Sequence, residues 1–423
     1  MIQTALKHLS RHTLLKNIGW LASGEMIARV TRLFAAVALA RALTPLEFGA
    51  AAIAITVFEL VRVFNQNGVG AAVIAADARD LPGLIRTAHL AGWVTGFTLA
   101  AAQCGLAVIV ADRTGSADIG WMIACLAGVY LIMPPGVAHG WMLQRTQNMR
   151  RLAAVNAVQV STDNLLTAIL ALSGFGAWSI VLPKLITAPI WLIGVMWGRP
   201  WRPDRTAKLE PPRQLLSFAA PVLASELLAA MRLHVDKLIV GAICGLELLG
   251  VYYFAFNAGL GLSSALSTAF NGAFYPNLCE GVRRTGSALS AFHKGMRTAG
   301  APLAILFLLQ AAAVPVYVPI VFGPEWSYAI PLIAILCLSG PAKLLADGCA
   351  LLLRANGQTR LELIAVAAMT LICLGSLLLG AQIGLQAAVI ALTLSATLTA
   401  LSLYPLTVSL CETQPDRQTQ TGA

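Results

Sequence analysis

Apolar runs of about 20 residues recur along the whole chain, separated by short polar stretches and by Pro- or Gly-containing turns. A run of about this length crosses a hydrocarbon core of roughly 30 Å as an α-helix. The runs do not alternate apolar with polar positions, as the strands of a membrane barrel do. The pattern therefore predicts an all-α membrane protein.

We expect about 12 transmembrane helices, arranged as two six-helix bundles. The first set is predicted at 18–40, 48–70, 88–110, 119–141, 153–173 and 177–198. The second set is predicted at 215–243, 248–276, 298–321, 327–352, 361–380 and 385–410.

The longest polar connection separates these two sets and contains Pro200, Pro203, Pro211 and Pro212. We expect an N-terminal lobe at 1–198, a cytoplasmic linker at 199–214, a C-terminal lobe at 215–410 and a cytoplasmic tail at 411–423. Leu43–Gly49 before the second helix and Gly245–Gly250 before the eighth are weakly similar. Repeated halves with a cavity between them are typical of transporters.

Composition supports the membrane assignment, because 58% of the residues are hydrophobic and 11% are charged. A soluble chain averages about 25% charged residues. The net charge of +10 would suggest a nucleic-acid partner in a soluble protein, but here most Lys and Arg outside the spans fall on one side. Arg41 and Arg113 are on the opposite side. The positive-inside rule then places both termini in the cytoplasm of a bacterial inner-membrane protein, with no nucleic-acid partner.

Charged residues also occur inside the predicted spans, where each costs about 2.5 to 3.5 kcal/mol near a helix centre. The bases are Arg29, Arg32, Arg62, Lys184, Arg232, Lys237 and Lys343, and the acids are Glu25, Glu59, Asp163, Glu226, Asp236 and Asp347. Such residues face a water-filled cavity or one another.

Spacing groups many of these charges. Glu25, Arg29 and Arg32 form one stripe on the first helix. The pairs Glu59 with Arg62, Arg232 with Asp236, and Lys343 with Asp347 are three or four residues apart and close enough to pair. We expect Asp163 and Lys184 to form a structural pair across the fifth and sixth helices.

A chamber that holds an anionic headgroup explains several such charges together, since Arg and Lys bind phosphate well. The candidate substrate-binding residues are Arg29, Arg32, Arg62, Arg232, Lys237 and Lys343. The candidate residues for ion coupling or charge pairing are Glu25, Glu59, Asp236 and Asp347. The alternative that each pair is only an internal salt bridge stays open.

The eight cysteines are scattered, without a Cys-x-x-Cys pair or nearby His at metal-ligand spacing. They are interpreted as small apolar residues of the helix packing. The chain also has no paired-carboxylate motif, Gly-rich phosphate loop or Ser/His/Asp constellation. We therefore expect no catalytic residues, no metal and no cofactor, and no enzymatic activity.

With these residues laid out, the chain resembles the polysaccharide transporter branch of the MATE-like (multidrug/oligosaccharidyl-lipid/polysaccharide, MOP) flippase superfamily, which contains the Wzx-type exporters. The similar segments are Ala40–Gly49, Asn67–Ile74, Leu143–Arg145, Gly174–Ser179, Phe218–Pro221, Asp236–Gly241, Leu249–Tyr252, Val321–Trp326 and Leu353–Gly357. Together they span nearly the whole chain.

The resemblance implies a flippase that moves a polyprenyl-diphosphate-linked oligosaccharide across the inner membrane for exopolysaccharide, capsule or O-antigen synthesis. It implies a cationic cavity, whereas the span charges here are nearly balanced. A polysaccharide polymerase and a chain-length regulator are the expected protein partners, and we expect a monomer. Two alternatives stay open: an ion-coupled multidrug or cation antiporter, and a membrane-embedded glycan polymerase or glycosyltransferase.

Overall fold

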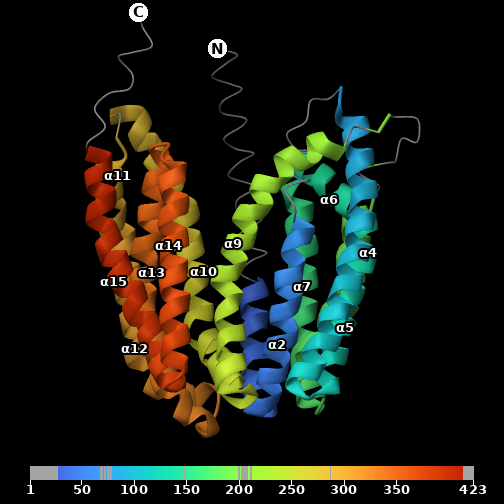
Figure 1. Ribbon diagram of the computed structural model, residues 1–423, viewed down its shortest axis with the longest axis horizontal. Helices are drawn as coiled ribbons and strands as arrows, with labels where there is room; N and C mark the ends of the chain where they lie inside the picture. Colours follow the sequence, from blue (N-terminus) through green and yellow to red (C-terminus); the bar gives the residue numbers. More distant parts are fainter. Residues whose placement is uncertain are drawn as a thin grey trace, which may run out of the picture. The chain divides into compact units, whose positions relative to one another are not determined.

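A computed structural model describes residues 27–66, 70, 73, 79–146, 148–198, 201, 208–209, 212–285 and 287–412, with some residues inside helices described by their backbone alone. These residues form helices joined by short turns, and no β-strand occurs among them (Figure 1). The all-α prediction is confirmed. By length and hydropathy, six of the described helices can cross a membrane, or up to seven if one bent pair counts as a single span. The total of about 12 spans stays a prediction.

The chain divides into two compact units, Met1–His234 and Val235–Ala423, called here the first and the second unit. The first unit contains a helix at 27–42, then α2 (Pro45–Arg62), η1 (Val63–Gln66), α4 (Leu81–Thr114), α5 (Ala117–Ile132), α6 (Pro134–Arg145), α7 (Met149–Leu172) and α8 (Trp178–Met196). Helix α9 (Pro212–Cys244) begins in the first unit and ends in the second. The second unit continues with α10 (Leu246–Thr285), α11 (Leu289–Gly295), the π-helix η2 (Met296–Gly300), α12 (Ala301–Val321), η3 (Pro324–Ala329), α13 (Ile330–Ala355), α14 (Thr359–Ala381) and α15 (Leu385–Glu412).

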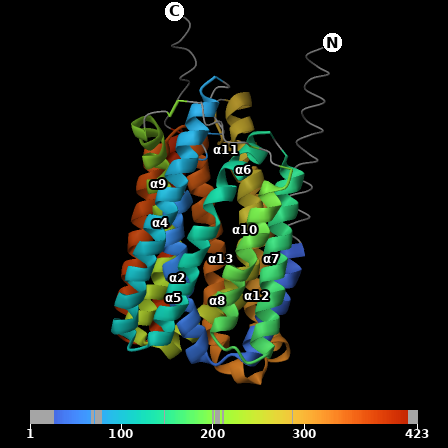
Figure 2. The ribbon, with the colours of Figure 1, turned by 90° about the vertical axis from the view of Figure 1, so that its right-hand side faces the viewer.

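Helices pack in the same order within each unit. In the first unit α5 packs against α2, α4 and α8, and α7 packs against α8 (Figure 2). In the second unit α13 packs against α10, α12 and α15, and α14 packs against α15 (Figure 1). The weak sequence repeat therefore has a counterpart in the packing of each unit.

The two repeated sequence segments lie where the sequence predicted them, at the starts of α2 and α10. Thr44 and Glu47 form a capping box, in which each side chain bonds the backbone N–H of the other residue. Gly245 precedes α10 with a φ of +87°, a left-handed conformation that favours glycine. After its cap, α2 buries Ala51, Ala52 and Ala54 completely, so that neighbouring helices approach closely.

The prediction of a single helix at 119–141 is wrong in one respect, because this segment forms two helices. Helices α5 and α6 meet at an angle of 56°. The break falls at Pro134 and Pro135, which have no backbone N–H to donate to the preceding turn. The prediction followed hydropathy alone and missed this effect of the proline pair.

Candidate functional site

The candidate charges of the first helix lie beside its packed face. Ala28 and Ala35 are buried, whereas Arg29 is half-buried and Arg32 is exposed. The helix is held to α7 by Asn164, whose side-chain amide donates to the Ala28 carbonyl at 3.2 Å and to the Thr31 hydroxyl at 3.0 Å. The two arginines therefore sit on a helix whose packed side is fixed. The third residue of the predicted stripe, Glu25, lies outside the described residues.

Arg62 and Glu59 form the ion pair that their spacing predicted. Arg62 Nη2 lies 2.6 Å from Glu59 Oε2, at the C-terminal end of α2. Here the helix carbonyls carry a partial negative charge, which also favours a base.

Asp163 of α7 and Lys184 of α8 pair across two helices, as predicted. Lys184 Nζ donates to Asp163 Oδ2 at 3.0 Å. These helices pack against each other, and a second polar contact between them is made by Arg151 of α7, whose guanidinium donates to the carbonyls of Gly194 and Val195 on α8.

Asp236 has a partner that helical spacing did not predict. Its carboxylate binds the ammonium of the adjacent residue, Lys237, at 3.1 Å and accepts a hydrogen bond from the Tyr252 hydroxyl at 2.7 Å. Lys237 also lies 4.2 Å from the ring centroid of Phe256, a distance at which a cation is attracted to the ring face. Since the predicted partner, Arg232, has a side chain outside the described residues, its pairing stays a prediction.

Lys343 and Asp347 pair along one face of α13, also as predicted. Lys343 Nζ donates to Asp347 Oδ2 at 2.9 Å. The same oxygen accepts a hydrogen bond at 3.2 Å from the side-chain amide of Asn271 on α10. Asn271 was not predicted, because its role depends on α10 packing against α13.

Arg354 is a further charged residue that was not among the predicted site residues. Its guanidinium donates to both carboxylate oxygens of Glu362, across the turn between α13 and α14. It also lies 5.9 Å from the ring centroid of Tyr275. The turn motif Leu353–Gly357 marked this region without indicating the partner, which is eight residues away.

In four of these five ion pairs the base is much more exposed than the acid. The exposed fractions of the basic side chains are 45% for Arg62, 31% for Lys184, 39% for Lys343 and 50% for Arg354. Their acidic partners are exposed by 18%, 15%, 12% and 11%. The pair of Lys237 and Asp236 is instead buried on both sides, at 6% and 8%. In these four pairs the positively charged side chain is therefore more exposed than the negatively charged one.

This asymmetry bears on the near balance of charges in the spans. A count of residues gives each acid the same weight as each base, but a ligand meets only what is exposed. Bases at the surface of these pairs offer N–H donors to an anion, while the buried carboxylates stabilise those bases from behind.

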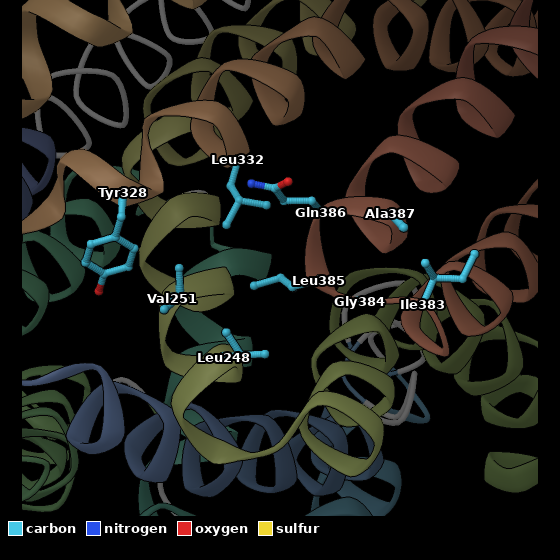
Figure 3. A pocket seen from close by; sticks show the side chains of 9 residues that line it. All are labelled: Leu248, Val251, Tyr328, Leu332, Ile383, Gly384, Leu385, Gln386 and Ala387. Atoms are coloured by element: carbon cyan, nitrogen blue, oxygen red, sulfur yellow. The ribbon is translucent and has the colours of Figure 1, made fainter.

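A pocket in the second unit has a different character. It is lined by Leu248 and Val251 of α10, by Tyr328 of η3 and by Leu332 of α13 (Figure 3). Residues 383–387, at the turn from α14 to α15, complete the lining. No charged residue lines it. In the part of the chain that the structure describes, no group of three or more His, Cys, Asp and Glu residues could hold a metal ion.

Comparison with known proteins agrees with this architecture. Over 333 residues the chain is 23% identical to the succinoglycan biosynthesis transport protein ExoT of Rhizobium meliloti, covering 77% of this chain and 66% of the relative. The chain spans about two thirds of the length of the curated relatives that it matches.

Two solved structures are similar in fold at low sequence identity. The lipid II flippase MurJ, in an inward closed conformation, superimposes with a TM-score of 0.76 at 12% identity, over 92% of this chain and 87% of that one. An inward-facing multidrug resistance MATE family transporter of the MOP superfamily superimposes with a TM-score of 0.67 at 15% identity, over 96% of this chain and 100% of that one.

The model of one protein family, described as polysaccharide biosynthesis protein, matches residues 38–331, which is more than half of the chain. This match confirms the resemblance that the sequence motifs indicated. The chain is a multi-pass membrane protein with the MATE-like fold, and it belongs to the polysaccharide biosynthesis protein family.

Proposed function

We propose that this protein is a flippase for lipid-linked oligosaccharides. Its cargo is a glycan joined through a diphosphate to a polyprenyl chain, which it carries from the cytoplasmic to the periplasmic leaflet by alternating access. It acts as a carrier and not as an enzyme, in the bacterial inner membrane, with both termini in the cytoplasm. A polysaccharide polymerase and a chain-length regulator are its partners in the same biosynthesis.

The observation that carries this proposal is the exposure of the bases within their ion pairs. Arg62, Lys184 and Lys343 offer charge-assisted donors on membrane helices, while their acids are mostly buried. A diphosphate needs such donors, and Arg and Lys both bind phosphate oxygens. The family match and the name of the succinoglycan transport relative support a glycan as the rest of the cargo.

The cation antiporter is the second candidate, since a multidrug transporter shares the fold. A carrier of organic cations requires carboxylates that its cargo can reach. Here Glu59, Asp163 and Asp347 are the less exposed members of their pairs, and Asp236 is buried. The exposure of the charges therefore favours an anionic cargo.

The first test concerns the two arginines of the first helix. We expect replacement of Arg29 and Arg32 together by Ala to abolish polysaccharide export, because both guanidiniums are lost from one helix face. Export is measured in cells that lack the chromosomal copy and carry the variant on a plasmid, with the membrane abundance of the protein measured in parallel.

Arg41→Ala is the matched control, because Arg41 is an exposed arginine near the end of the same helix. We expect it to leave export unchanged. Normal export by the double variant, at normal abundance, would remove these arginines from the proposed site.

A further inference from the structure

Asn271 connects two helices of the second unit at a charged position. It lies on α10, and its amide nitrogen is 3.2 Å from Asp347 Oδ2 on α13. An ionised carboxylate only accepts hydrogen bonds, so the amide must present its N–H₂ group to it. In this hydrogen bond Asn271 is therefore the donor and Asp347 the acceptor.

Asp347 receives a second donor at the same oxygen. Lys343 Nζ lies 2.9 Å from Asp347 Oδ2, one helical turn before it on α13. The carboxylate is exposed by 12% and the lysine side chain by 39%. Asp347 is thus fixed from the α10 side by Asn271, while the ammonium that it holds remains accessible.

We propose that Asn271 is a positioning residue for anion binding. Through Asp347 it fixes the Lys343 ammonium in the orientation that receives a diphosphate oxygen of the cargo. Asn271 itself does not touch the cargo. This inference rests on the proposed function, because it takes Lys343 as a donor to the diphosphate.

The physical basis is the cost of ordering a flexible side chain. A lysine side chain has many rotamers, and binding must overcome the loss of that freedom if the ammonium is not already held. A carboxylate that two groups share cannot move with the lysine, so it holds the ammonium in one place. Loss of the Asn271 amide removes the hydrogen bond from α10 that helps to fix Asp347, and with it the position of the Lys343 ammonium.

The test measures the affinity of the purified full-length protein for a short-chain prenyl diphosphate, with the matching prenyl alcohol as a second ligand. We expect Lys343→Ala to weaken diphosphate binding about tenfold, which corresponds to about 1.4 kcal/mol. We expect Asn271→Ala to weaken it about threefold to tenfold. Neither variant should change binding of the alcohol, which has no anionic group.

The double variant distinguishes positioning from general damage to the structure. If Asn271 acts through Lys343, adding Asn271→Ala to Lys343→Ala should cause no further loss, since the group being positioned is already absent. Asn257→Ala is the matched control. Asn257 is an exposed residue of the same helix, and its amide donates to the Tyr253 carbonyl of its own helix at 2.8 Å. We expect it to bind the diphosphate like the unaltered protein.

Two kinds of result would overturn the inference, and only the second also affects the proposed function. If Lys343→Ala weakens binding but Asn271→Ala behaves like Asn257→Ala, or if the two losses add, Asn271 has no positioning role and the proposed function stands. If Lys343→Ala binds the diphosphate normally, or if the alcohol binds as tightly as the diphosphate in the unaltered protein, Lys343 is not a donor to the headgroup. In that case the role of Lys343 in the proposed function fails as well.

Discussion

Asp236 and Lys237 differ from the other ion pairs in that neither side chain is exposed to any large extent. They are 8% and 6% exposed, and Tyr252, which donates to Asp236, is completely buried. An ammonium held by a carboxylate and an aromatic ring, with this little exposure, is poorly placed to exchange partners. We infer that this pair is structural, although Lys237 was predicted to bind substrate.

Removing one member of this pair should therefore destabilise the protein. We expect Asp236→Ala to lower the free energy of unfolding by about 3 to 5 kcal/mol, because it leaves the buried Lys237 ammonium without its carboxylate. The measurement is thermal or denaturant unfolding of the purified protein in detergent.

The double variant Asp236→Leu with Lys237→Met is the control, since replacing a buried pair by apolar residues is often neutral. We expect it to recover most of the lost stability. A double variant as unstable as Asp236→Ala would show that packing around Asp236, or the buried Tyr252 hydroxyl left without its acceptor, determines the loss, and not the unpaired charge.

Three of the predicted ion pairs are present, two of them set by helical spacing and one, Asp163 with Lys184, formed across two helices. The pair of Asp236 with Lys237 and the contact of Asn271 with Asp347 were not predicted. Glu59 with Arg62, and Lys343 with Asp347, follow from the i,i+3 and i,i+4 rule alone. Asp236 with Lys237 does not, because side chains one residue apart normally point in different directions. Asn271 required knowledge of which helix packs on α13, which no local pattern contains.

At the scale of elements, the turn between α7 and α8 illustrates how one segment depends on another far away in the chain. Glu47 uses one carboxylate oxygen, Oε2, in the capping box that starts α2. Its other oxygen, Oε1, lies where a Cβ at Gly176 would be. Gly176 has a φ of +55° in the α7–α8 turn, so both its conformation and its lack of a side chain are needed.

The same turn contains a second glycine, Gly174, with which Gly176 can be compared. Gly174 has a φ of +82°, but a Cβ there would meet no atom within 4 Å. We expect Gly174→Ala to cost about 1 to 2 kcal/mol, the strain of a left-handed alanine. Gly176→Ala should cost more, because the methyl group also displaces Glu47 from its position at the start of α2.

Unfolding of the two variants in detergent measures the difference. Combining Gly176→Ala with Glu47→Ala separates the two contributions, since the clash is then absent and only the conformational strain and the lost cap remain. Equal stabilities of Gly174→Ala and Gly176→Ala would contradict the interpretation that Glu47 packs against this turn.

At the scale of the whole molecule, hydropathy predicted the helices well and their ends less well. The predicted helix at 88–110 corresponds to α4, which extends over Leu81–Thr114, because a hydropathy pattern follows the membrane and not the end of the helix. The turns at Thr44 and Gly245 were predicted in place, before the second and the eighth helix, but the capping box and the left-handed glycine were first seen in the structure. The break between α5 and α6 was missed because hydropathy does not report the missing backbone N–H groups of Pro134 and Pro135.

The proposed orientation of the chain is also a property of the whole molecule, and it rests on the Lys and Arg distribution. In a variant without its own cysteines, we expect Ser116→Cys in the α4–α5 turn to react with a membrane-impermeant maleimide in intact cells. Thr146→Cys, at the end of α6, should react only after the membrane is made permeable. The opposite labelling pattern would reverse the proposed orientation of both termini.

The acids held behind the exposed bases have a consequence for the return step of a carrier. A carrier that has released an anionic cargo must change conformation empty, and an isolated ammonium would then be left uncompensated in a low-dielectric surrounding. Asp347 and Asp163 lie within hydrogen-bonding distance of Lys343 and Lys184, so each base already has its own counter-charge. In the proposed transport cycle, the empty protein would therefore return with these two bases already neutralised, without carrying a small anion back to them in place of the cargo.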